Sequence, residues 1–249
     1  MVMFLIIKNI FKIHLFFYVV MVICLLTGNI RDYLVFTSII IVHELGHISA
    51  GVFFSWKVKR VILLPFGGLT IFDNLVNTSL FEEFIVALMG PVFQVLFYFF
   101  ISRFFIISDS VRYFNFVLLF FNLLPIYPLD GSKFLYVFLC FLLPFKYCFF
   151  VLIIISFVFI FFVFLFVGHF DFVVFLILFF LIFKCLSVFL NYRVIFNKFL
   201  FERYFYDFNF RRVRRVDSVS SMYLWCRHLF NVDGSYVSEK KFLSKLFDK

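Results

Sequence analysis

The stretch Ile41-Val42-His43-Glu44-Leu45-Gly46-His47 sets three ionisable side chains inside an apolar segment that runs from about residue 33 to 54. In a helix, residues four apart lie on one face, so His43 and His47 present two imidazoles at one point, with Glu44 on an adjacent face. Ionisable groups inside an apolar span are costly and survive where they are paired or functional. The stretch therefore predicts a metal site within a membrane-spanning helix.

The composition also indicates a membrane protein. The 249 residues are 65% hydrophobic and 15% charged, and 49 of them are phenylalanine. An average soluble domain has about 25% charged residues, and a soluble core cannot absorb this much apolar surface. The predicted fold class is an all-α polytopic membrane protein with about six transmembrane helices. The expected spans are about 13–28, 33–54, 83–106, 148–167 and 171–190, with a fourth segment in chain order that starts at about 112, is broken by Pro125, Pro128 and Gly131, and continues as a short helix to about Leu143.

The formal net charge of +9 is concentrated at one end, because twelve of the 23 Lys and Arg residues follow residue 192. Cationic residues between apolar segments normally mark cytoplasmic loops, so the charge indicates topology and not nucleic-acid binding. Lys8, Lys12, Lys57–Arg60 and Lys146 fall on the same side as the C-terminal residues in a six-span arrangement. Both termini are therefore predicted to be cytoplasmic. The five cysteines lack metal-type pair spacing and are interpreted as small buried hydrophobes.

Two interruptions of the apolar pattern predict local structure. Lys57–Leu64 alternates and leads into Pro65-Phe66-Gly67-Gly68, which predicts a small membrane-associated β-hairpin about a Gly-Gly turn. The third span contains Gly90-Pro91, and a proline within a helix is expected to bend it and open space on one side.

A catalytic zinc needs a third protein ligand besides the two histidines. Two acids other than Glu44 lie at or near a span, Asp130 and Asp171. Asp130 follows a proline-broken stretch, and irregular backbone at membrane depth is tolerated where it is buried in protein or lines a wet cavity. This context favours Asp130, with a helix-capping or turn role as the alternative. Glu44 would then remove a proton from the attacking water and pass it to the leaving amine.

The C-terminal residues form a separate region in this interpretation. Residues 1–192 are predicted to be the transmembrane metalloprotease domain, and residues 193–249 a basic cytoplasmic tail that is densest at Arg211–Arg215. The tail could lie on the anionic lipid of the cytoplasmic leaflet, or it could dock a protein or regulate the enzyme.

Two motifs carry a resemblance to a known family. His43-Glu44-Leu45-Gly46-His47, followed by Asn122, Pro125, Pro128 and Leu129-Asp130-Gly131, resembles the site-2 protease family of intramembrane zinc proteases. Residues 53–68 and 199–204 resemble its sporulation members. The resemblance implies that His43, His47 and Asp130 bind one Zn²⁺ and that Glu44 is the general base. It also implies substrate contacts at Asn122, Gly67, Gly68 and Pro125, the glycines lying in a membrane-dipping loop near the entrance.

The resemblance further implies a substrate and partners. The sporulation members cleave the pro-sequence of a sporulation sigma factor, pro-sigma-K, in the mother cell and are held inactive by partner membrane proteins. Three features depart from the family pattern: Gln94 stands where many members have Asn, Ser132 where many have Gly, and residues 216–249 would form only a truncated CBS-like remnant. The alternative function is a catalytically silent or metal-permeating membrane protein that keeps the zinc pocket, although such a protein needs no base at Glu44.

A membrane-embedded helical substrate must unwind before its scissile carbonyl can reach a metal, and pairing with an enzyme strand could stabilise the unwound form. Lys57–Leu64 is the expected strand for this pairing, so proline at Ile62 or Leu63 is expected to abolish cleavage without loss of zinc.

Overall fold

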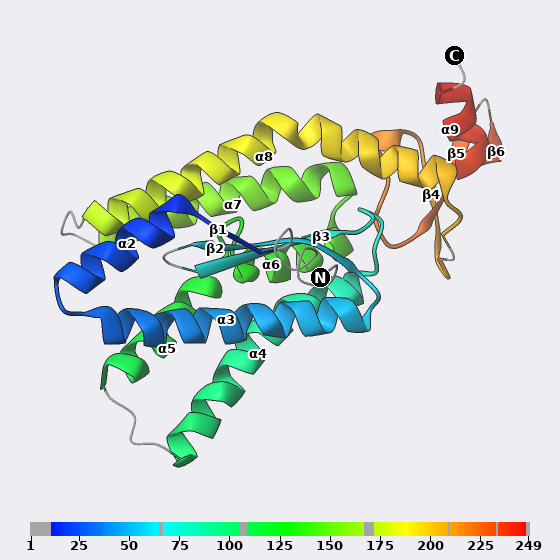
Figure 1. Ribbon diagram of the computed structural model, residues 1–249. Helices are drawn as coiled ribbons and strands as arrows, with labels where there is room; N and C mark the ends of the chain where they lie inside the picture. The colour runs from blue at the N-terminus through cyan, green and yellow to red at the C-terminus, as the bar shows by residue number, and fades with distance from the viewer. Residues whose placement is uncertain are drawn as a thin grey trace. The chain divides into compact units, whose positions relative to one another are not determined.

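The computed structural model describes residues 11–64, 67–104, 109–166, 172–208, 210–232 and 234–247, and most of them are helical (Figure 1). The chain divides into two compact units. The first comprises Met1–Asn74 and Phe84–Leu123, and the second comprises Leu75–Glu83 and Leu124–Lys249. The largely helical architecture with small sheets confirms the predicted fold class.

The helices of the first unit are α2 (Leu15–Leu26), α3 (Ile30–Phe53), α5 (Asp109–Asn122) and most of α4 (Leu80–Phe104). Helix α3 carries both histidines and packs against α5 and the neighbouring sheet. Helix α4 continues through Pro91 to Phe104, so the proline lies inside the helix and does not end it. Proline is tolerated within a spanning helix where neighbouring groups satisfy the backbone group that it frees.

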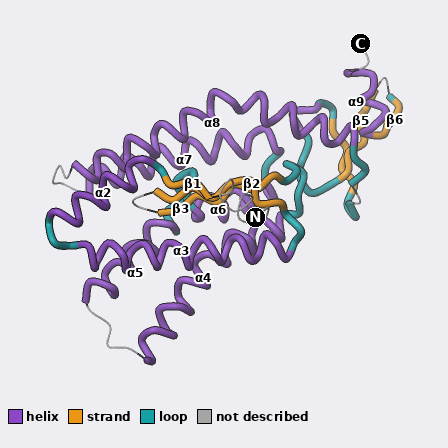
Figure 2. Tube along the Cα trace, viewed as in Figure 1, coloured by secondary structure: helices purple, strands orange, loops and turns teal. Residues whose placement is uncertain are grey.

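A three-stranded sheet belongs to the same unit, in the order β1-β2-β3 (Figure 2). Strand β1 (Phe11–Ile13) pairs in parallel with β2 (Lys57–Leu64), and β2 pairs antiparallel with β3 (Gly67–Asp73). The expected hairpin is therefore present. Its glycines do not form the turn, because Gly67 and Gly68 begin β3 opposite Leu64 and Leu63. Pro65 and Phe66 lie outside the described residues.

Lys57–Leu64, the strand expected to pair with substrate, already has partners within the sheet. Strand β2 is the central strand, and Val61–Leu63 pair with β1 on one side and β3 on the other. The test expected for Ile62 and Leu63 fails for the same reason, because proline there would break the sheet itself.

Four described helices are long and apolar enough to cross a membrane, namely Ile30–Phe53, Leu80–Phe104, Phe145–Leu165 and Val174–Phe205. The expected count of six included Leu15–Leu26, which has only 12 residues. The fourth segment, expected to be broken at its prolines, is present as α5 and α6 (Asp130–Leu142), of 14 and 13 residues. These three helices are shorter than the about 20 residues with which a single helix crosses the hydrocarbon core.

The second unit contains α6, α7 (Phe145–Phe166) and α8 (Phe172–Phe205). Helices α7 and α8 run side by side (Figure 1). Helix α8 is continuous to Phe205, so residue 192, where the domain boundary is expected, falls inside a helix. Asp171, the weaker candidate for the third ligand, lies outside the described residues.

The C-terminal residues fold into a small α/β module within this unit. Strand β4 (Val213–Val216) pairs in parallel with β5 (Arg227–Val232), and β5 pairs antiparallel with β6 (Ser235–Ser238). The 3₁₀ helix η1 (Val219–Ser221) and helix α9 (Glu239–Phe247) complete the module. It shares a hydrophobic core with α6, α7 and α8 that includes Phe145, Phe199 and Phe230. All five cysteines are free, and four are buried as predicted, whereas Cys24 is only half-buried.

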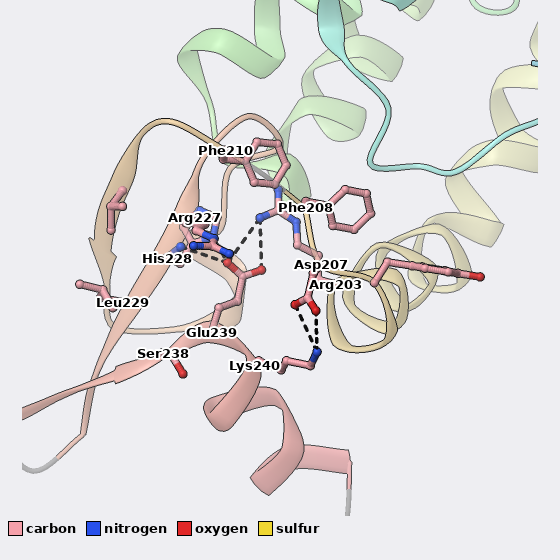
Figure 3. A pocket seen from close by; sticks show the side chains of 12 residues that line it. Arg203, Asp207, Phe208, Phe210, Arg227, His228, Leu229, Ser238, Glu239 and Lys240 are labelled. Carbon is pink, nitrogen blue, oxygen red and sulfur yellow. Dashed lines mark hydrogen bonds and ion pairs between the residues drawn. The ribbon is translucent and has the colours of Figure 1, made fainter. Parts of the chain in front are cut away.

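A buried polar network joins α8 to this module. The Arg203 guanidinium donates hydrogen bonds to the Cys226 and Leu224 carbonyl oxygens at 2.8 and 2.6 Å and to Glu239 Oε1 at 3.2 Å. Figure 3 shows Arg203 and Glu239 facing each other beside a cavity of about 420 Å³. Because its hydrogen-bonding groups are satisfied within the protein, the network stabilises the module.

Acidification is expected to destabilise the module. Burial lowers the pKa of His228, although Glu239 opposes this effect, and His228 Nε2 accepts the Tyr223 N–H at 2.9 Å, a bond that protonation would remove. Burial raises the pKa of Glu239. The hydrogen bond from His228 and the positive charge of Arg203 lower the same pKa by more than burial raises it, so the net shift is downward. When the pKa of a group is lower in the folded state, the unfolded state binds the proton more readily, so stability is lost as pH falls. Here the loss should begin below the ordinary pKa values, 6.5 for histidine and 4.5 for glutamate.

The measurement is Trp225 fluorescence during thermal unfolding, in a Trp56→Phe background because Trp56 and Trp225 are the only tryptophans. The unfolding temperature should fall from pH 7 to pH 4, with a smaller slope in Glu239→Gln. An unfolding temperature independent of pH would contradict the expectation.

Candidate metal centre

The two histidines of α3 meet as the helical spacing predicts. His43 and His47 are 2% and 3% exposed, and their Nε2 atoms lie 3.1 Å apart. Two nitrogen ligands of a tetrahedral zinc, each about 2.0–2.1 Å from the metal, are separated by about 3.3 Å. The separation of the two imidazoles therefore suits a single metal ion between them.

The other ring nitrogen of each histidine determines its tautomer. His43 Nδ1 lies 2.9 Å from Gln94 Oε1, and His47 Nδ1 lies 2.8 Å from the Val86 carbonyl oxygen. Both oxygens are acceptors, so each Nδ1 carries the proton and each Nε2 of a neutral ring carries a lone pair. Two lone pairs that face each other cannot form a hydrogen bond. They do provide two ligand atoms for a cation.

The space beside these nitrogens depends on the absence of a side chain in α4. A Cβ atom at Gly90 would overlap His47 Nε2 and lie 2.8 Å from His43 Nε2. A Cβ at Gly46 of α3 would similarly overlap the Met89 carbonyl oxygen and lie 3.0 Å from Gly90 Cα. The two glycines thus let α3 and α4 approach closely at the level of the imidazoles.

Glu44 is 4% exposed and faces strand β3. The Thr70 hydroxyl donates a hydrogen bond to Glu44 Oε2 at 2.6 Å. A Cβ at Gly68 would lie 2.5 Å from Glu44 Cδ and Oε1, so only glycine allows β3 to pass this close. Gly67 has open space where its side chain would be. The hairpin therefore contacts Glu44 through Gly68 and Thr70.

Asn122 is the last residue of α5, and its amide Nδ2 lies 3.4 Å from His43 Nε2. It is buried, as is Gln94, which Asn115 of α5 contacts from its other side. Helix α5 thus brings one amide side chain to the Nε2 side of His43 and supports a second on the Nδ1 side.

Asp130 lies in the second unit, at the first residue of α6. Its side chain is buried and its Oδ1 lies 3.1 Å from Lys133 Nζ. The N-cap residue of α6 is Leu129, and Asp130 lies in the first turn of the helix. Pro125 is half-buried in the irregular stretch before this helix.

The donor set suits zinc. His43 and His47 in the first unit and Asp130 in the second are all buried, and each offers a ligand atom of a kind that binds metal ions. Two imidazole nitrogens and one carboxylate oxygen are the ligand types of catalytic zinc sites, which leave a fourth position for water.

The fold and these side chains define a class of protein, a multi-span membrane protein with potential metal ligands buried in its helices. Residues 33–111 match the family model of peptidase family M50. These residues are therefore similar to that peptidase family, and the motifs resemble its site-2 protease type. The similarity and the four candidate spans indicate an integral membrane protein.

Individual proteins share this similarity. The chain is 38% identical over 143 residues to "Stage IV sporulation protein FB" of Bacillus subtilis, covering 54% of this chain and 49% of that protein. It is 29% identical over 112 residues to "Zinc metalloprotease MJ0392" of Methanocaldococcus jannaschii, covering 41% and 32% of the two chains. The matches thus span half or less of the length of these relatives.

The solved structure "Site-2 Protease from Methanocaldococcus jannaschii" shares the fold, with a TM-score of 0.57 at 20% identity. That match covers 71% of this chain and 89% of the solved chain.

Sequence reasoning missed several residues that shape the site. Gly90 was interpreted only as part of a bend, and Gln94 only as a departure from the family pattern. Thr70 carried no signal, since a single threonine in a strand is unremarkable in sequence. Gly90 and Gln94 belong to α4 and Thr70 belongs to β3. Their contacts with α3 join distant parts of the chain, so the spacing of residues in the sequence could not reveal them.

Proposed function

We propose that this protein is an intramembrane zinc endopeptidase in which His43, His47 and Asp130 bind one zinc ion and Glu44 is the general base. The observation that carries the proposal is that the Nε2 atoms of His43 and His47 lie 3.1 Å apart, with each ring oriented by a hydrogen bond at Nδ1. The buried carboxylate of Glu44 belongs to the same helix. Zinc bound there would lower the pKa of a water molecule and polarise the substrate carbonyl.

Glu44 supplies the proton transfers in this mechanism. The Thr70 hydroxyl occupies Oε2 and orients the carboxylate, which leaves Oε1 to receive the proton of the attacking water. The same carboxyl group then returns that proton to the leaving amine. The surrounding apolar helices exclude bulk water, which strengthens the electrostatic interactions in the site.

Asn122 is proposed to bind the substrate backbone. Its Nδ2 already points toward His43 Nε2, so an amide donor lies beside the position where the carbonyl would be polarised. Gly67, Gly68 and Pro125 are proposed to line the approach of the substrate, the glycines because they are in the strand that contacts Glu44.

The proposed substrate is a membrane-associated protein, in particular the pro-sequence of a sporulation sigma factor of the pro-sigma-K kind. The proposal is supported by the similarity to a relative named as a stage IV sporulation protein. Inhibitory membrane partner proteins in the mother cell are proposed on the same basis.

Co-expression with a candidate pro-sigma factor tests this function, because removal of the pro-sequence gives a faster band on a gel. We expect the faster band with the wild-type chain and its loss when zinc is chelated. An inert or metal-permeating protein would leave the substrate uncut.

The termini are proposed to be cytoplasmic. With native cysteines replaced, His169→Cys should react with a membrane-impermeant maleimide added outside the cell, and Ser244→Cys of α9 should react only after permeabilisation. The reverse labelling would invert the proposed orientation.

The basic tail is proposed to contact anionic lipid headgroups. Arg211, Arg212, Arg214 and Arg215 are exposed, and Arg214 lies 4.2 Å from the centre of the Tyr223 ring. Replacing the four arginines with glutamine should reduce the anionic lipid that co-purifies with the detergent-solubilised protein. Unchanged lipid content would favour a docking or regulatory role.

A further inference from the structure

Gln94 lies in the middle of α4 and is fully buried, with 0% of its surface exposed. A buried primary amide is tolerated when its donors and its acceptor are paired. Gln94 meets this condition through one histidine on α3 and one asparagine on α5. The three residues form a chain of hydrogen bonds across three helices of the first unit.

Asn115 determines which way the Gln94 amide points. Gln94 Nε2 lies 2.8 Å from the Asn115 backbone oxygen and 3.1 Å from Asn115 Oδ1. The backbone oxygen can only accept, so the NH₂ group of Gln94 must face Asn115. The carbonyl Oε1 is consequently left facing His43 Nδ1 at 2.9 Å.

An acceptor at Nδ1 places the proton of a neutral His43 on that nitrogen and leaves Nε2 unprotonated. It also fixes the rotation of the ring. We propose that Gln94, oriented by Asn115, is a positioning residue that holds His43 in the tautomer and orientation needed for metal binding. This inference rests on the proposed function, because it assigns a role toward the zinc of that same site.

His47 provides an internal comparison. Its Nδ1 bonds to the backbone oxygen of Val86, which no substitution of a side chain removes. The two histidine ligands are therefore supported in different ways. Changes at Gln94 should therefore perturb His43 directly, whereas the Val86 contact of His47 does not depend on Gln94.

Two substitutions separate a positioning role from a packing role. Gln94→Met keeps the length and shape of the side chain but removes the acceptor. Gln94→Glu keeps an acceptor toward His43 but sets a carboxylate against the backbone oxygen of Asn115. If Gln94 positions His43, zinc affinity should be highest in wild type, lower in Gln94→Glu and lowest in Gln94→Met. Thermal stability should instead be lower in Gln94→Glu than in Gln94→Met, because the glutamate buries an unpaired charge.

The experiment measures zinc affinity of the full-length protein in detergent by competition with a chelator, alongside its thermal unfolding. Gln94→Met should bind zinc about 10–100-fold more weakly, the loss typical when a metal-bound histidine loses its partner. Gln94→Glu should remain within about threefold of wild type. With cobalt in place of zinc, the visible absorption bands should shift in Gln94→Met, because the ligand orientation changes.

Zinc affinity of Gln94→Met equal to wild type, or Gln94→Glu as weak as Gln94→Met, would overturn the positioning role while leaving the proposed function intact. A wild-type protein that binds no zinc would overturn both.

Discussion

Replacing Glu44 with glutamine is expected to abolish cleavage while zinc stays bound. Glutamine keeps the shape of the side chain but cannot accept a proton from water, and general acid–base catalysis typically contributes about 10²–10⁴-fold to the rate. Because His43, His47 and Asp130 are untouched, the zinc content should remain near one per chain. The measurements are the gel shift of the co-expressed substrate and the metal content of the purified protein.

Asp73→Asn is the matched control for this substitution. It also exchanges a carboxylate for an amide, but Asp73 is exposed at the end of β3. Cleavage by this variant should equal that of wild type. Substantial cleavage by Glu44→Gln would show that another group removes the proton, and loss of zinc from it would assign Glu44 to the metal instead.

Replacing Gly90 with alanine is expected to remove the metal. The added Cβ would overlap His47 Nε2 and come within 2.8 Å of His43 Nε2, so at least one imidazole must move away from the shared position. Loss of a partner of a ligand costs about 10–100-fold in metal affinity, and displacement of the ligand itself should cost at least the upper value. Zinc affinity by chelator competition measures this effect, and cleavage should fall with it.

Gly67→Ala is a suitable control for zinc binding, because a Cβ there has nothing within 4 Å. It should retain the metal. If Gly90→Ala also bound zinc with wild-type affinity, the close approach of α4 to the imidazoles would not limit the site.

The elements of this protein could be predicted to different degrees. The hairpin was predicted from alternation and glycine, and two strands are present, but their glycines start β3 and do not form the turn. Lys57–Leu64 was predicted to pair with substrate, but β1, more than 40 residues earlier in the chain, already pairs with Val61–Leu63 of this strand. The break at the prolines before Asp130 was predicted, and α5 ends before them while α6 begins after them.

The sequence by itself determined the membrane class, because an apolar composition leaves few alternatives to spanning helices, and the pairing of His43 with His47, because helical periodicity is a local property. It also singled out Asp130 by its place after a proline-broken stretch. Only the tertiary structure decided which nitrogen of each ring faces the metal position, since Gln94 and Val86 of α4 fix that choice. Likewise, only packing brought Gly90 against the imidazoles and Thr70 onto Glu44. These contacts join segments that are distant in the chain, and their existence depends on how the helices and strands pack.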